Sequence, residues 1–268
     1  MADYLTRLFA RAFHQLLLLF GGMLTLAFLL CLVAGQIRGA GAAVFGKGYY
    51  YFVAPGVVCH ETGHALGCLL TGTKIVKFEP FRPRGDSLGQ VVAAQKEGSL
   101  AGQIAMVLIG SGPVWFGCLV IGALAKWLAA GGMGPEGGAT GIADGFLSSG
   151  AYWKQVVQAA WGMSRRVFRW KNWLSTRNVL CLDLIFCVAS EMGMSPEDFH
   201  AMRWGLACLG GLFLVLNLVP AIGLATSRFA FRVSCRLFPV HVLMVFVLLA
   251  DFLFVVLLVW PVRLVWGG

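Results

Sequence analysis

Charged residues are scarce in this chain. They make up 12% of its 268 residues, whereas hydrophobic residues make up 59%. A typical soluble domain is about 25% charged and about 45–50% apolar. A soluble globule of this composition could not cover its surface with polar groups. The sequence therefore excludes an ordinary soluble enzyme and a disordered chain.

The sequence also argues against a disulfide-rich protein and against a nucleic-acid-binding protein. No CxxC pair occurs among the eight cysteines, which lie singly and mostly within apolar runs. We therefore expect neither a disulfide framework nor a cysteine zinc ribbon. The net charge is +9, but Lys and Arg lie in the connections between apolar runs, where membrane proteins keep them. This distribution argues against a nucleic-acid partner.

Long apolar runs dominate what is present. A membrane-spanning helix needs about 20 predominantly apolar residues. The runs that approach this length are 13–34, 50–71, 101–129, 179–194, 201–224 and 240–260. We predict an all-α polytopic membrane protein, a bundle of five or six transmembrane helices forming one membrane domain over 1–268. The expected location is the lipid bilayer of the plasma (cell inner) membrane.

The connections between the runs add local structure. Residues 35–49 are rich in glycine and predict a loop, and residues 130–150 predict another. The β-like stretches 74–81 and 88–94, separated by turn-forming residues, predict a small hairpin at the membrane surface. Residues 151–173 combine helical apolar spacing with Arg and Trp, a composition that suits the headgroup region. The Lys and Arg count leaves the topology after residue 100 open.

One motif carries chemistry. The second apolar run contains His60-Glu61-Thr62-Gly63-His64, an HExxH pattern. Residues four apart share one face of a helix, so His60 and His64 can bind one zinc ion while Glu61 takes a proton from a zinc-bound water. A Glu and two His within an apolar span are costly to bury, which indicates a function for them. Gly63 and Gly67 would let another helix or a substrate backbone approach closely.

With this motif, the chain resembles the site-2 protease family of intramembrane zinc metalloproteases. The matching residues are His60 to Leu66, followed by Thr71-Gly72 and the extended stretch 74–81. Gly112-Pro113 is similar to the family's Gly-Pro motif, and Asn217-Leu218-Val219-Pro220 to the start of its N-x-x-P…L-D-G motif.

The resemblance implies a specific set of roles. It implies a protease-like core over about 48–225, with additional helices at 13–34 and 240–260. It also implies a zinc cofactor, Glu61 as the catalytic residue, and a membrane-embedded protein as substrate. The residues it places at the substrate are Gly112, Pro113, Asn217 and Pro220.

The chain departs from the family at the third zinc ligand. Where the family has the aspartate of its LDG motif, this chain has Ala225, and the Asn that follows the family's Gly-Pro motif is replaced near Phe116. The remaining acids at membrane depth are Asp183, Glu191 and Asp251. An ionised Asp flanked by apolar residues is costly unless it is paired or bound to metal. We predict Asp183 as the third ligand, with Asp251 as the main alternative.

These residues together predict an intramembrane zinc metalloprotease that hydrolyses peptide bonds in or near transmembrane segments. Two alternatives stay open. The missing aspartate would suit a catalytically inactive, protease-like protein that binds transmembrane clients. A path lined by His60, Glu61 and Asp183 would suit a transporter.

Overall fold

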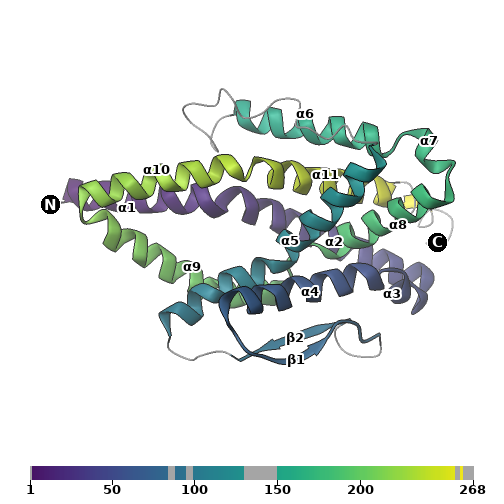
Figure 1. Cartoon of the computed structure of the whole chain (residues 1–268), viewed down its shortest axis with the longest axis horizontal. Helices are drawn as coiled ribbons and strands as arrows, with labels where there is room; N and C mark the ends of the chain where they lie inside the picture. Colours follow the sequence, from purple (N-terminus) through teal and green to yellow (C-terminus); the bar gives the residue numbers. More distant parts are fainter. Residues whose placement is uncertain (1, 84–87, 95–98, 130–149, 257–259, 262–268) are drawn as a thin grey trace.

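The computed structural model describes residues 2–83, 88–94, 99–129, 150–256 and 260–261, and these residues are mainly helical (Figure 1). The chain begins with one continuous helix, formed by α1 (Ala2–Leu16), a π-helical turn η1 (Leu17–Gly21) and α2 (Gly22–Phe45). The helices that follow are α3 (Gly48–Phe52), α4 (Ala54–Thr71), α5 (Leu100–Leu128), α6 (Gly150–Val167), α7 (Trp170–Trp173), α8 (Thr176–Glu191), α9 (Pro196–Asn217), α10 (Pro220–Arg236) and α11 (Phe238–Phe254).

Three of these helical segments are long and apolar enough to cross a membrane. They are Asp3–Phe45, Leu100–Leu128 and Pro196–Asn217. The pair α10 and α11 passes the same test as one segment with a bend of 44°. The described chain therefore has three, or with the bent pair four, helices suited to spanning, fewer than the five or six that the sequence predicts.

The two predicted spans that do not qualify are helical but short or polar. Residues 50–71 are divided between α3 and α4, and α4 carries two histidines and a glutamate. Most of the run 179–194 falls in α8, which has only 16 residues and contains Asp183 and Glu191. The prediction of a loop at 35–49 is wrong, because α2 continues to Phe45. There Gly41 packs directly against the ring of Tyr49, so tertiary contact overrides the low helix propensity of glycine.

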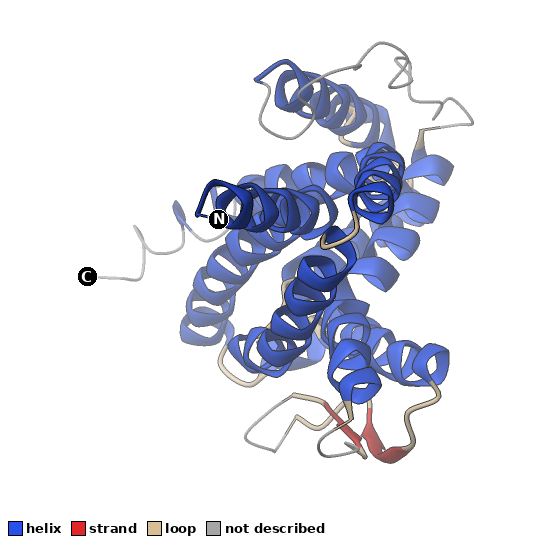
Figure 2. Ribbon diagram, turned by 90° about the vertical axis from the view of Figure 1, so that its left-hand side faces the viewer, coloured by secondary structure: helices blue, strands red, loops and turns tan. Residues whose placement is uncertain are grey.

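The predicted hairpin is confirmed. Strand β1 (Ile75–Glu79) pairs antiparallel with β2 (Gln90–Ala93), with Glu79 opposite Gln90 and Ile75 opposite Ala93. The register shifts at a bulge between Ile75 and Lys77. The hairpin lies along α4 at the edge of the helical body (Figure 2). The predicted amphipathic segment over 151–173 is helical as α6 and α7, whereas 130–149 lie outside the described residues.

Helix α5 organises the packing, since it contacts α4 and α9 and also α8 and α11 (Figure 1). Its contact with α4 is close because both helices present glycine there. A Cβ on Gly63 would lie 2.7 Å from backbone atoms of Gly112, and a Cβ on Gly67 would lie 2.7 Å from the Cα of Ile109. Only glycine fits at such distances, so the two backbones touch.

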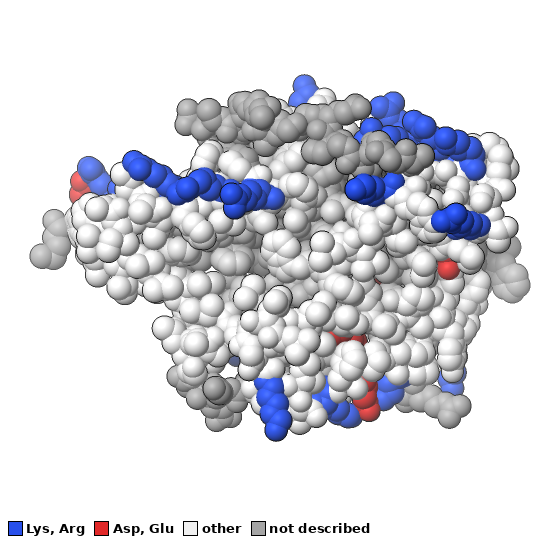
Figure 3. Space-filling view, in the orientation of Figure 1, with Lys and Arg blue, Asp and Glu red and all other residues white. Residues whose placement is uncertain are grey.

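Lys and Arg are concentrated at the edges of the molecule in the face shown in Figure 3. They gather along the upper edge, over α10 and the α6–α7 region, and along the lower edge near the hairpin. The surface between these edges is almost free of charge. Large apolar side chains point outward on the long helices, for example Leu119 on α5 at 71% exposure and Val215 on α9 at 62%. Such exposure is costly in water and favourable in lipid.

Candidate metal centre

The HExxH motif lies in the middle of α4. The helix begins with Pro55 in its first turn, where the missing N–H of proline has no cost. It ends at Gly72, whose left-handed conformation (φ 65°) lets its N–H bond back to the carbonyls of Cys68 and Leu69. Between these ends, His60 and His64 lie one helical turn apart on one face.

Each histidine is oriented by a backbone carbonyl of another helix. The Nδ1 atom of His60 lies 2.7 Å from the carbonyl oxygen of Glu191, and Nδ1 of His64 lies 2.8 Å from that of Ile109. A carbonyl oxygen can only accept, so both Nδ1 atoms carry the proton. In a neutral ring this leaves each Nε2 with a free lone pair. Glu191 is the last residue of α8, and its carbonyl is one of those that a helix end leaves without an internal partner.

A third side chain, that of Asp198 in the first turn of α9, lies next to the two histidines. The N–H of Asp198 donates to Oγ of Ser195 at 3.2 Å, and Oδ2 of Asp198 accepts from the N–H of Ser195 at 2.7 Å. This reciprocal capping box fixes both the helix start and the carboxylate. The positive end of the helix dipole also favours an anion there.

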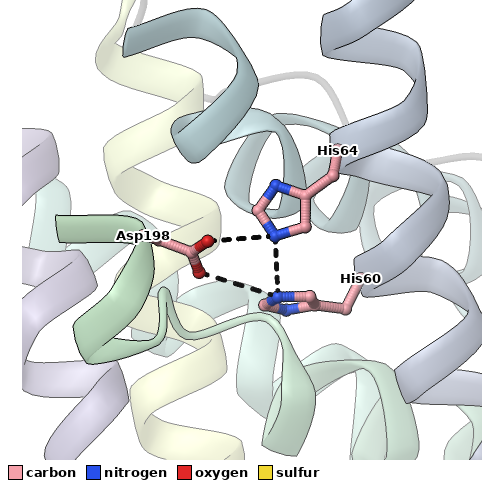
Figure 4. Close-up of side chains that lie close together, drawn as sticks. All are labelled: His60, His64 and Asp198. Carbon is pink, nitrogen blue, oxygen red and sulfur yellow. Dashed lines mark hydrogen bonds and ion pairs between the residues drawn. The ribbon is translucent and has the colours of Figure 1, made fainter. Parts of the chain in front are cut away.

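The three side chains converge on one point (Figure 4). The two Nε2 atoms lie 3.1 Å apart. Asp198 Oδ1 lies 3.2 Å from Nε2 of His64, and Asp198 Oδ2 lies 3.7 Å from Nε2 of His60. The side chains are only 12–14% exposed. Two lone pairs and a carboxylate at these distances repel one another unless a cation or a shared proton lies between them.

The structure brings His60 and His64 together as the motif predicts, but it does not bring Asp183 to them. Asp183 lies on α8 two turns before Glu191, about 12 Å along the helix from the carbonyl that contacts His60. Asp251 is buried on α11 and its carboxylate oxygens have no hydrogen-bond partner among the described residues. The side chain of Glu191 faces Arg38 at 3.8 Å. The geometry therefore groups Asp198 with the two histidines, whereas Asp183, predicted from the sequence for this position, does not join them.

The sequence does not single out Asp198, because this residue lies outside the apolar runs in which a buried acid stands out. In the sequence, Asp198 precedes the predicted apolar run 201–224 and lies among the polar residues Ser195-Pro196-Glu197-Asp198. A Ser followed by Pro and an acid three residues later is a signature of a helix N-terminus. That signature places the carboxylate at a helix start, yet nothing local indicates that this helix end meets the His60/His64 face.

Glu61 lies beside the group without joining it. Its side chain is 8% exposed. Gly89, immediately before β2, packs on it so tightly that a Cβ at Gly89 would lie 2.6 Å from Cγ of Glu61 and 2.9 Å from Oε1. The hairpin thus covers the glutamate, and an extended backbone already runs next to it.

The four residues that the resemblance places at the substrate separate into two pairs. Gly112 and Pro113 lie in α5 against the backbone of Gly63, directly beside the motif. Asn217 ends α9, about 28 Å along that helix from Asp198, and Pro220 begins α10 beyond it.

Asn217 has a structural partner instead. Its Nδ2 donates to Oε1 of the fully buried Gln15 and to the carbonyl of Phe213, both at 2.7 Å. These hydrogen bonds satisfy the Asn217 amide at the break between α9 and α10. Asn217 and Pro220 therefore belong to that break and do not contribute to the His60/His64 region. Ala225 lies farther along α10, where its side chain is exposed.

Comparisons with protein-family models, with curated proteins and with solved structures gave no match to this chain. What the site can do follows from its own donors. Two neutral imidazoles and one carboxylate can hold a divalent cation. A buried glutamate next to them can exchange a proton with a group bound there.

Proposed function

We propose that this protein is a polytopic membrane protein of the plasma (cell inner) membrane and a zinc metalloprotease that cleaves membrane-embedded segments of other proteins. The observation that carries the proposal is the convergence of His60, His64 and Asp198 beside Glu61. The membrane assignment is supported by the long apolar helices and their outward-facing apolar side chains.

The donor set fits zinc. Zinc binds imidazole nitrogen and carboxylate oxygen at about 2.0–2.2 Å, so tetrahedral ligands lie about 3.3 Å from one another. The Nε2–Nε2 and Nε2–Oδ1 distances of 3.1 and 3.2 Å match this spacing, and the second carboxylate oxygen, Oδ2, lies 3.7 Å from Nε2 of His60. Three protein ligands leave one position open, which is typical of catalytic rather than structural zinc. When bound, zinc would polarise the scissile carbonyl and acidify a water molecule.

The residues of this chain would then do three things. His60 and His64 present their Nε2 lone pairs, because Glu191 and Ile109 hold the protons on the opposite nitrogens. Asp198 supplies negative charge from a fixed helix start. Glu61 takes the proton of the attacking water and returns it to the amine of the leaving group, as a general base and then a general acid.

The hairpin suits a peptide substrate. The peptide carbonyls of a helical substrate are engaged in hydrogen bonds, so a protease must bind it locally unwound. Gly89 brings the start of β2 against Glu61, and each strand of the two-stranded sheet has one unpaired edge. A substrate segment that pairs with such an edge would lie extended beside the glutamate.

The position of Asp198 also bears on the two alternatives. An inactive, client-binding protein was suggested by the missing aspartate at Ala225, but Asp198 supplies a carboxylate to the histidines from a different helix. A transport path through His60, Glu61 and Asp183 would need Asp183 near the histidines. Asp183 lies two turns of α8 away from Glu191, whose carbonyl contacts His60.

Cleavage of a polypeptide tests the proposal. The purified chain in detergent, supplied with zinc, should cut unfolded β-casein, whose backbone is already extended. Glu61→Gln should keep the metal, because Glu61 is not a ligand, but reduce cleavage by at least about 100-fold, as expected for loss of a general base. Thr62→Ala, at a neighbouring position outside the metal group, is the matched control. Undiminished cleavage by the Glu61→Gln variant would overturn the mechanism.

A further inference from the structure

The hydrogen bond between His64 and Ile109 depends on an unusual acceptor. Ile109 lies in the interior of α5, where the carbonyl of each residue ordinarily accepts from the N–H four residues later. Nevertheless its oxygen lies 2.8 Å from Nδ1 of His64, on a different helix. An interior helix carbonyl is not normally left for an outside donor.

Proline explains the availability of this carbonyl. The residue four positions after Ile109 is Pro113, and α5 continues through it to Leu128. Proline has no N–H and cannot donate to Ile109. The carbonyl would be a buried, unsatisfied acceptor without another donor, and Nδ1–H of His64 supplies one.

The approach of the two helices makes the bond geometrically accessible. Gly67 lets α4 lie directly on the backbone of Ile109, and Gly63 does the same at Gly112 and Pro113. Because no Cβ separates the helices there, the imidazole of His64 reaches the carbonyl across the contact. The missing N–H of Pro113 and the freed carbonyl of Ile109 thus lie about one turn apart on α5, and His64 of α4 contacts that carbonyl.

We propose that Pro113 is a positioning residue for the metal centre. By withholding a backbone N–H, it reserves the Ile109 carbonyl for Nδ1–H of His64. It thereby fixes the tautomer whose Nε2 lone pair faces His60 and Asp198. This role rests on the proposed zinc site, but the hydrogen bond itself can be tested without metal.

Pro113→Ala is the informative variant, because alanine restores the N–H that competes for the Ile109 carbonyl. Loss of an orienting partner of a ligating histidine typically weakens metal binding by 10–100-fold. We expect the zinc dissociation constant of the full-length chain, measured by competition with a chromophoric chelator, to rise within this range. Alanine is also the better helix former, so the variant should unfold at the same temperature as the wild type or higher.

Val114→Ala is the matched control. Val114 is the next residue of α5 and is fully buried, and its truncation removes packing without adding an N–H. We expect it to lower the unfolding temperature and to leave the zinc dissociation constant within about three-fold of wild type. A merely structural role for Pro113 would predict parallel effects in the two variants on both quantities.

The hydrogen bond is read separately by NMR of metal-free protein labelled with ¹⁵N-histidine, with the His64 signal assigned by its loss in His64→Gln. The Nδ1–H resonance should move upfield in Pro113→Ala and stay in place in Val114→Ala. An unmoved resonance in Pro113→Ala overturns the inference. So does zinc affinity equal to wild type in that variant, and in that case the zinc site itself stands. Absence of zinc binding by the wild type would overturn the proposed function, and the NMR result would still decide the role of Pro113.

Discussion

Oδ1 of Asp198 lies 3.2 Å from Nε2 of His64, although the two residues come from different helices, α9 and α4. The contact joins a helix start to the middle of a helix. It places a carboxylate opposite the HExxH histidines from a polar segment outside the apolar runs.

Removal of this carboxylate should release the metal. Asp198→Ala leaves two imidazoles, so we expect zinc affinity to fall by more than about 100-fold, beyond the effect of losing an outer partner. Asp183→Ala is the control, since Asp183 lies two turns from the Glu191 carbonyl that orients His60. Zinc content after dialysis against a mild chelator measures both variants. Retention by Asp198→Ala together with loss by Asp183→Ala would reinstate Asp183 as the ligand.

The cap at Ser195 should contribute to stability more than to metal binding. Ser195→Ala removes the side-chain acceptor for the N–H of Asp198 and should cost about 1 kcal/mol. Oδ2 of Asp198 keeps its bond to the backbone N–H of Ser195, so zinc affinity should change only a few-fold.

Ser175→Ala is the matched control for this cap, because Ser175 precedes α8 without making a side-chain cap bond. Reversible unfolding in mixed micelles compares the two variants. Equal stability of both would contradict the capping role of Ser195.

The glycine contact between α4 and α5 should be essential to the site. A methyl group at position 63 would lie 2.7 Å from the backbone of Gly112, so Gly63→Ala must push the helices apart. We expect a loss of about 1–3 kcal/mol, as for other overpacked sites, together with weaker zinc binding.

Gly162→Ala in α6 is the comparison, because nothing lies within 4 Å of a Cβ at that position. It should stabilise the protein slightly through its higher helix propensity. Thermal unfolding and zinc titration of both variants test this, and tight zinc binding by Gly63→Ala would show that the close approach is not needed.

The sequence predicts well the features that arise from neighbouring residues. The HExxH spacing puts His60 and His64 on one face whatever the rest of the chain does, and the β-like stretches around residues 75 and 91 pair as expected.

Features that depend on packing between distant helices are not predictable in this way. The glycine-rich stretch after Ala34 looks like a loop, but it is helical because α2 packs on α8 and α11 and Tyr49 fits against Gly41. Asp198 looks like part of a polar connection, and only the packing of α9 on α5 brings its helix start to His64. Asn217 follows the motif pattern, but it is engaged by Gln15 from the first helix.

The metal itself is the most direct test of the central claim. We expect purified, full-length protein to contain about one zinc per chain. Its zinc X-ray absorption should show two imidazole nitrogens and low-atomic-number oxygen ligands at about 2.0–2.2 Å. His60→Ala, His64→Ala and Asp198→Ala should each lose that zinc. Wild-type protein without zinc after reconstitution, or a zinc content equal to that of the wild type in all three variants, would contradict this metal site.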